Sequence, residues 1–342
     1  MKDKALEPAG ALRIKTIEAH AAGEPLRIIT QGFPPLPGRT ILAKRRFAKK
    51  HYDHLRTALM GEPRGHADMY GAIITPPERK DSHIGVLFLH NEGFSTMCGH
   101  GIIALTTAVL EAGLVKVRGS RPVLRIDTPA GLVEARARIA AGRVREVSFR
   151  NVPSFVYALD QRVEVPGIGG IDYDLAFGGA FYAFCRAEDL GLRLVPAEFR
   201  KIIEAGMKIK QAVMRSRAVK HPFEKDLGFL YGTIIIGPAA KPSHHSRNVC
   251  VFADGEVDRS PTGTGVSARA AILRARGQIT KDQDFIVESI LGTCFTGRVV
   301  RETRIGPYNA VIPEVTGRAH LTGRAEWLID PRDPLKNGFF LR

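Results

Sequence analysis

Residues 97–101 read MCGHG, and much later in the chain residues 261–265 read PTGTG. Each segment places one chemically useful side chain directly before a Gly-x-Gly triplet. In the first segment this side chain is the thiol of Cys98, and in the second it is the alcohol of Thr262. The two segments therefore look like two copies of one structural unit that differ at the position most able to do chemistry.

A run with helical periodicity follows each segment: IIALTTAVLEA at 102–112 and VSARAAILRAR at 266–276. Gly113 and Gly277 come directly after these runs, at the same distance from Cys98 and Thr262. A glycine at this point predicts a left-handed cap at the helix C-terminus. The first helix is apolar on nearly every side, which predicts a helix enclosed by a sheet.

The similarity continues downstream, where IDTPAGLV at 126–133 resembles VESILGTC at 287–294. Alternating apolar runs predict strands between and around the two helices. Examples are residues 85–90, 147–149 and 233–236. Strands outnumber helices, so the sequence predicts two related α+β halves, with a boundary near residues 151–154.

Length and composition are typical of a globular protein, because 342 residues are enough for two domains and 44% of them are apolar. No segment resembles a signal peptide or approaches the roughly 18 apolar residues of a membrane span, so we expect a cytoplasmic protein with no membrane partner. The net charge of +15 raises the question of nucleic-acid binding. However, the basic clusters at 44–46 and 49–51 have no helix-turn-helix, RNP or zinc-finger pattern beside them. We therefore expect a basic solvated surface and no nucleic-acid partner.

Four cysteines are present and none forms a Cys-x-x-Cys pair, so the sequence predicts neither a metal site nor a disulfide framework. Cys185, Cys250 and Cys294 lie in apolar, strand-like runs and are expected to be small buried side chains. Cys98 instead lies among Gly, His and Thr at the start of a predicted helix. The positive end of that helix is expected to lower the pKa of the Cys98 thiol below its ordinary value of about 8.5.

Two helix N-termini that face one cleft can neutralise a small carboxylate, because their free N–H groups and glycines allow close approach. A thiolate beside such a ligand can act as a nucleophile or as a base. No protease-like pattern surrounds Cys98, and His100 is only two positions away, which favours proton abstraction next to a carboxylate. The residues alone leave open the alternative of a structural, buried cysteine at a glycine-rich helix start.

Four motifs spread over most of the chain resemble those of the proline racemase family. They are EAHAAGEP at 18–25, MCGHG at 97–101, AFGGAFY at 176–182 and DRSPTGTG at 258–265. The combination of the second and fourth motifs is highly specific. The resemblance implies an α+β fold of the diaminopimelate-epimerase type. Such a fold has two pseudo-symmetric lobes, each a curved, mostly antiparallel sheet around a central helix, with the active site in the cleft between them.

The resemblance and the internal repeat together suggest how the chain is divided. The first lobe is expected to span 12–155 and to contain the Cys98 helix. The C-terminal tail, 330–342, is expected to rejoin this lobe. The second lobe is expected to span 156–329 and to contain the Thr262 helix. The assembly is expected to be a monomer or a homodimer that acts on a small amino acid.

The resemblance also implies the chemistry. The family's racemases and epimerases carry cysteine at both helix starts, so one thiol removes the α-proton and the other returns a proton on the opposite face. Thr262 departs from that pattern, and a Cys/Thr pair resembles the family's trans-3-hydroxy-L-proline dehydratases. The implied reaction begins when Cys98 abstracts the α-proton; the 3-hydroxyl leaves as water and Δ1-pyrroline-2-carboxylate forms. A proline or hydroxyproline racemase or epimerase is the nearest alternative, and a non-catalytic nucleic-acid-binding protein is a remote one.

By resemblance, the substrate carboxylate and ring are held by the backbone N–H groups of Gly99, His100, Gly263 and Thr264. Asp258 is expected to pair with the ring nitrogen, and one role open to Thr262 is a hydrogen bond to the departing hydroxyl. No cofactor or metal is implied, because the leaving hydroxyl takes up the electrons of the carbanion. Some epimerases of the family place a histidine on a strand before the Asp-Arg-Ser-Pro motif, and the comparable stretch here, 230–233, has none.

Overall fold

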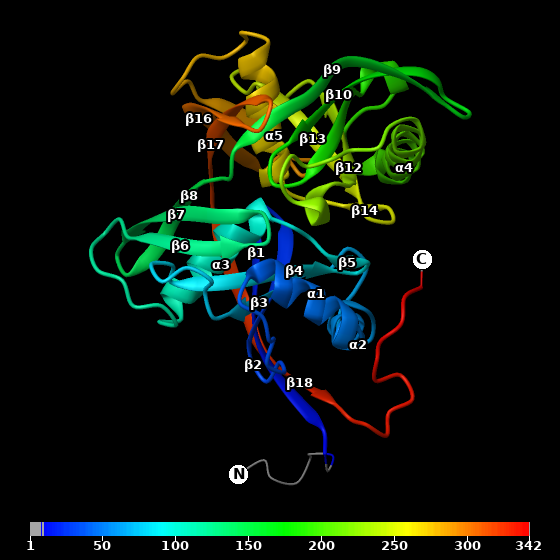
Figure 1. Ribbon diagram of the computed structural model, residues 1–342. Coiled ribbons are helices and arrows are strands. Elements are labelled where there is room, and N and C mark those ends of the chain that lie inside the picture. Colours follow the sequence, from blue (N-terminus) through cyan, green and yellow to red (C-terminus); the bar gives the residue numbers. More distant parts are fainter. Residues whose placement is uncertain (1–7, 9, 342) are drawn as a thin grey trace.

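A computed structural model of the protein describes residue 8 and residues 10–341. This part of the chain contains five α-helices and 18 strands, and the strands form one continuous hydrogen-bonded sheet. Most neighbouring strands are antiparallel, and the parallel pairs are β2–β3, β4–β6, β11–β12 and β13–β15. The sheet bends around two helices, α3 (Gly99–Glu111) and α5 (Gly263–Ala275), which lie in different parts of the molecule (Figure 1).

Helix α3 packs against strands that form the lower part of the molecule in Figure 1. The strands of this part are β1 (Leu12–Ala21), β2 (Glu24–Gln31), β3 (Tyr70–Thr75), β4 (Ile84–His90), β5 (Gly93–Phe94), β6 (Val123–Thr128), β7 (Gly131–Ala140), β8 (Arg143–Arg150) and β18 (Ala319–Ile329). Two further helices, α1 (Ile41–His51) and α2 (Asp53–Met60), pack against β4. The Cys98 segment is therefore held at the end of a helix that is enclosed by the sheet.

Helix α5 packs against strands in the upper part of Figure 1. The strands of this part are β9 (Ser154–Val165), β10 (Gly169–Phe177), β11 (Phe181–Arg186), β12 (Leu230–Gly237), β13 (Ser246–Phe252), β14 (Glu256–Val257), β15 (Phe285–Glu288), β16 (Cys294–Ile305) and β17 (Tyr308–Gly317). Helix α4 (Phe199–Ser216) covers β12 and β13, and short 3₁₀ helices occur at Glu188–Leu190, Pro196–Glu198 and Lys225–Leu227. Among the described residues, no helix is both long and apolar enough to cross a membrane.

Both central helices end as the sequence predicts. Gly113 follows α3 with φ +67°, and Gly277 follows α5 with φ +69°. In α3 the N–H of Gly113 donates to the Leu110 carbonyl and the N–H of Leu114 donates to the Val109 carbonyl. The equivalent pair of hydrogen bonds closes α5. This pattern is the Schellman motif, which requires a left-handed residue that glycine adopts without steric cost.

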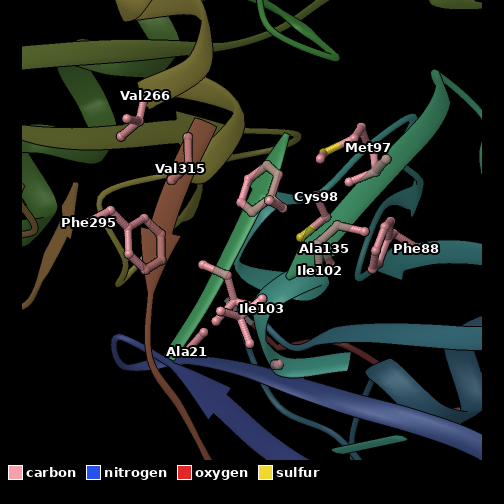
Figure 2. Packing of buried hydrophobic residues seen from close by; sticks show 14 of the residues in the cluster. Ala21, Phe88, Met97, Cys98, Ile102, Ile103, Ala135, Val266, Phe295 and Val315 are labelled. Atoms are coloured by element: carbon pink, nitrogen blue, oxygen red, sulfur yellow. The ribbon is translucent and has the colours of Figure 1, made fainter. Parts of the chain in front are cut away.

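The buried core connects the two helices (Figure 2). Every residue of α3 from 99 to 109 is buried, and Ile102 and Ile103 belong to the same apolar cluster as Val266 of α5. Phe295 and Val315, on β16 and β17, lie in this cluster between them. Burial of a branched aliphatic side chain stabilises a fold by roughly 1.5–3 kcal/mol, so this packing fixes where each helix begins.

Strand β18 bears on the expected division of the chain. It pairs along its whole length with β1, from Leu12 opposite Ile329 to Ala21 opposite Ala319. Residues 319–329, expected at the end of a second lobe spanning 156–329, therefore pair with a strand that packs against α3. The physical reason is that β18 covers the edge of β1 that β2 leaves free, and an uncovered edge strand exposes unpaired N–H and C=O groups. Beyond β18 the tail lies against the lower part, where Phe339 bridges to Glu62.

Candidate active site

Cys98 is the N-cap residue of helix α3. Its backbone is extended, with φ −144° and ψ 112°, and its Sγ accepts a hydrogen bond from the Gly101 N–H at 3.2 Å. Cys98 is 4% exposed. Burial raises the pKa of its thiol well above the ordinary value, and the Gly101 N–H opposes this shift only in part. The expected lowering of the Cys98 pKa is therefore wrong, because loss of hydration outweighs the helix N–H groups.

His100 lies between the thiol and a carboxyl group. Its Nδ1 is 3.3 Å from Cys98 Sγ and 4.0 Å from Asp258 Oδ2. Burial lowers the pKa of His100 to about 3, and the Pro25 backbone opposes this shift. The imidazole is therefore neutral near pH 7, so it can orient the thiol without adding a positive charge beside it.

The segment from Asp258 to Thr262 is shaped by its own polar side chains. Asp258 Oδ1 accepts a hydrogen bond from the Ser260 N–H at 2.7 Å, and Ser260 Oγ accepts one from the Thr262 N–H at 3.1 Å. Such short-range bonds are how Asp and Ser form tight turns. Burial raises the pKa of Asp258 to about 6, so its carboxyl group is mostly ionised at pH 7. The buried Glu24, from β2, accepts a hydrogen bond from the Arg259 N–H at 2.7 Å and holds this segment from the other side.

Thr262 begins helix α5 in a different way from Cys98 at α3. Its φ of 66° and ψ of 91° lie where β-branched residues are rare, and its side chain does not cap the helix. The hydroxyl Oγ1 is buried and makes no hydrogen bond of ordinary geometry among the described residues. It nevertheless lies close enough to the Asp258 carboxyl group and the Cys250 thiol to lower the pKa of each. Threonine is a good N-cap residue, so a threonine that leaves its helix uncapped suggests a constraint other than stability.

Gly99 and Gly263 bring the two helix starts into contact. A Cβ atom built on Gly99 would lie 2.5 Å from Gly263 Cα, and one built on Gly263 would lie 2.7 Å from Gly99 Cα. Real Cβ atoms are essentially never found this close to backbone. Only glycine at both positions allows the two N-termini, with their free N–H groups, to face one ligand.

The seven residues expected to form the site line one small cavity, located where α3 and α5 begin. They are Cys98, Gly99, His100, Asp258, Thr262, Gly263 and Thr264. The structure thus brings together every predicted site residue, although they come from segments about 160 positions apart in the sequence. The individual roles of these residues stay predictions.

Six further residues line the same cavity: Tyr70, Met97, Tyr182, Tyr231, Cys250 and Phe252. None of them was named individually as a site residue from the sequence, although Met97 and Tyr182 lie in two of the quoted motifs. Cys250 is buried as expected, but it also reaches the cavity wall, and the nearby Thr262 hydroxyl partly offsets the rise that burial causes in the pKa of its thiol. Cys250 and Phe252 alternate on β13 directly before the Asp258 turn. Residues two apart on a strand point to the same face, so their position shortly before Asp258 was the available sequence signal that both face the site.

The tyrosine hydroxyls of the cavity are already hydrogen-bonded. Tyr70 donates to Ser95 Oγ at 2.7 Å and is 3.1 Å from the hydroxyl of Tyr231. Tyr182 is 2.6 Å from Thr264 Oγ1. Tyr231 belongs to the stretch 230–233, where some epimerases of the family have a histidine and this chain has none. In this protein the phenol of Tyr231 lines that part of the cavity wall. No cluster of three or more His, Cys, Asp or Glu side chains suited to a metal ion occurs in the described part of the chain.

A buried thiol, an ionisable carboxyl group and two touching helix N-termini thus share one small cavity, an arrangement typical of an enzyme active site. The chain belongs to the proline racemase family, because the family model described as "Proline racemase" matches residues 16–340.

Individual relatives are similar over nearly the whole chain. A trans-3-hydroxy-L-proline dehydratase of Colwellia psychrerythraea is 52% identical over 337 residues, which cover 98% of this chain and 95% of the relative. A 3-hydroxyproline 2-epimerase of Burkholderia multivorans is 44% identical over 329 residues, which cover 96% of this chain and 98% of the relative. The crystal structure of a hydroxyproline epimerase from Agrobacterium vitis, with bound trans-4-hydroxy-L-proline, superposes with a TM-score of 0.91 at 32% identity and 96% coverage of both chains.

Proposed function

We propose that this protein is a cofactor-independent hydro-lyase that converts trans-3-hydroxy-L-proline to Δ1-pyrroline-2-carboxylate. The observation that carries the proposal is the unequal pair of helix starts, which present the Cys98 thiol from α3 and the Thr262 alcohol from α5. An alcohol is far too weak an acid to match a thiol near neutral pH. The Colwellia relative, named for this dehydration, supports the same assignment.

In the proposed complex the substrate carboxylate lies between the two helix N-termini. The free N–H groups of Gly99, His100, Gly263 and Thr264 face this point, and the positive ends of both helices favour an anion there. The carboxylate of Asp258, mostly ionised above pH 6, pairs with the ring ammonium group. These contacts place Cα next to Cys98, and the same N–H groups stabilise the enolate-like charge that forms when the α-proton is removed.

Cys98 acts as the base only as a thiolate, which its buried position disfavours. Bound substrate lowers the pKa of the Cys98 thiol, because its ring ammonium group brings a positive charge beside the sulfur. The Gly101 N–H bond to Sγ stabilises the thiolate further. We therefore propose that the thiol ionises mainly in the presence of substrate.

We propose further that the cavity lies between two lobes that arose by duplication. In each lobe a strand before the central helix pairs parallel with a strand after it, as β4 with β6 and β13 with β15. In each, the strand after the helix then forms an antiparallel pair with the next strand, β6 with β7 and β15 with β16. On the pairing of β18 with β1, we assign 12–155 and 319–341 to the first lobe and 156–318 to the second.

The proposal is tested with a panel of L-proline, trans-4-hydroxy-L-proline and trans-3-hydroxy-L-proline incubated with the enzyme in deuterated water. NMR spectroscopy follows the pyrroline product and the α-proton signal, and chiral chromatography follows inversion. We expect pyrroline product from the 3-hydroxy compound alone. D-amino acid from the other two substrates, without pyrroline product from the third, would refute the dehydratase.

The alternative, a hydroxyproline epimerase, is favoured by one observation: Cys250 gives the cavity a second thiol close to Thr262. If a second acid at the start of α5 is what an epimerase needs, Thr262→Cys supplies it. We expect this variant to gain measurable inversion of trans-4-hydroxy-L-proline at the expense of dehydration. If wild-type enzyme already inverts that substrate and Cys250→Ala abolishes the inversion, the epimerase assignment replaces ours.

A further inference from the structure

The proposed dehydration requires a proton for the departing hydroxyl, and most polar side chains of the cavity cannot supply one. The hydroxyl proton of Tyr70 is donated to Ser95, and the hydroxyls of Tyr182 and Tyr231 pair with other side chains of the cavity wall. The imidazole of His100 is neutral, and its Nδ1 lies toward the thiol. The carboxyl group of Asp258 is mostly ionised at pH 7, and in the proposed complex it pairs with the ring ammonium group. The other donors in the described cavity wall are the thiols and the Thr262 alcohol.

Stereochemistry decides which of these donors is on the correct side. In trans-3-hydroxy-L-proline the 3-hydroxyl is trans to the carboxylate, so it lies on the same ring face as the α-hydrogen. Cys98 is the base, and therefore it lies on that face. Thr262 begins the other helix and, with Cys250 close to it, lines the same cavity. With the substrate carboxylate held between the two helix starts, we place Thr262 on the opposite face.

We propose that Cys98 is both the base and the acid, so that the elimination is syn and is carried out by one side chain. The thiolate takes the α-proton, and the Cα–H electrons form the Cα=C3 double bond. The C3–O bond breaks while the new S–H proton passes to the departing oxygen. Water leaves and the Cys98 thiolate is regenerated, so each turnover balances with no external acid. This inference rests on the proposed function, whose substrate sets the face of the hydroxyl.

The same arrangement gives Thr262 a role that differs from a hydrogen bond to the leaving group. It occupies the face of Cα opposite the base, where a stronger acid would return a proton and invert the centre. With a weak acid there, elimination is the only productive fate of the carbanion. The raised pKa of the buried Cys98 thiol suits the first half of this role, because it makes the thiolate a stronger base.

The first test compares trans-3-hydroxy-L-proline with cis-3-hydroxy-L-proline, whose hydroxyl lies on the Thr262 face. Pyrroline formation and α-proton exchange are followed by NMR in deuterated water. We expect elimination from the cis isomer to be at least about 100-fold slower, the usual loss when a general acid is out of reach. Similar rates from both isomers would overturn the acid assignment and leave the dehydratase intact. No product from the trans isomer would refute the dehydratase itself, and this inference with it.

The second test asks whether Thr262 protonates the leaving group, by comparing the hydroxyl with fluoride, which needs no such proton. We expect Thr262→Val to slow elimination from trans-3-hydroxy-L-proline and from trans-3-fluoro-L-proline by the same factor, within about threefold. Thr107→Val, at a buried threonine of α3 outside the cavity, is the matched control. If Thr262→Val slows loss of hydroxyl at least about tenfold more than loss of fluoride, Thr262 is the acid and the proposal falls. A general loss of folding would affect both substrates equally and cannot imitate that result.

Discussion

The thiol of Cys98 is held by three close partners: the Gly101 N–H, the His100 ring and, beyond it, the Asp258 carboxyl group. His100 and Asp258 were expected as site residues from the sequence, but their distances from the thiol were not. The position of Asp258 depends on a loop from the far half of the chain. At the scale of single residues, the site is thus a reactive group whose surroundings are assembled from two distant segments.

Replacement of Cys98 by Ser should remove most of the activity, because a serine hydroxyl ionises far less readily than a thiol. We expect kcat for dehydration to fall by at least about 10²–10⁴-fold, the range for loss of a general base. The matched control is Cys185→Ser, at a buried thiol that does not line the cavity. Retention of more than a tenth of the activity in Cys98→Ser would show that another group is the base.

The pH dependence should report Asp258. Burial raises the pKa of this carboxyl group to about 6, so its ionised fraction falls as the pH decreases through 6. If the ionised form binds the ring ammonium group, kcat/KM declines below about pH 6. In Asp258→Asn we expect lower kcat/KM throughout and no decline attributable to this group. A decline of unchanged position in Asp258→Asn would assign it to a different residue.

At the scale of secondary-structure elements, the two central helices could be located from sequence alone. Gly-x-Gly at the start of a helix and a glycine after its last periodic residue depend only on neighbouring residues. They can therefore be recognised without knowledge of the tertiary structure. Cavity residues such as Tyr70 and Cys250 could not be found in this way, because strand pairing decides what they face. The raised pKa of Cys98 was missed for a related reason, since burial depends on the whole core around α3.

The contact between the two helix starts leads to a prediction about stability. Gly99→Ala would place a methyl group 2.5 Å from the backbone of Gly263, and no flexible side chain is available there to move aside. We expect a loss of roughly 1–3 kcal/mol or more in the free energy of unfolding, the usual cost of overpacking. Chemical denaturation measures it, with Gly323→Ala as control, because a Cβ on Gly323 meets nothing within 4 Å. Equal stability of the two variants would show that the helix starts do not need to touch.

At the scale of the whole molecule, polar contacts around the cavity join the part that contains α3 to the part that contains α5. They include the buried pair of His90 with Glu256 at 3.1 Å, and the partly buried pair of Arg259 with Asp68 at 2.8 Å. The pair Arg46–Asp226 at 2.9 Å lies farther out, between α1 and a short 3₁₀ helix. The contacts nearest the cavity are therefore the least exposed to solvent.

The outer pair should contribute little. Arg46 is 60% and Asp226 32% exposed, and ion pairs of this kind are worth about 0.2–1 kcal/mol after solvent screening. We expect Arg46→Ala to raise KM by less than about fivefold, with the difference disappearing at high salt. Steady-state kinetics at two ionic strengths measure this effect. A larger increase in KM, or one that persists in high salt, would assign Arg46 a role beyond this pair.

The pairing of β18 with β1 has a consequence for protein engineering. A fragment that ends near residue 155 lacks β18 and leaves one edge of β1 uncovered, so it is a poor candidate for independent expression. Leu12 and Ile329, by contrast, lie directly opposite each other. A circular permutant that joins the old ends and opens near Arg318 would make each half of the molecule contiguous in sequence. Such a permutant would allow the two halves to be produced separately and recombined, so that the Cys98 and Thr262 helices could be exchanged as modules.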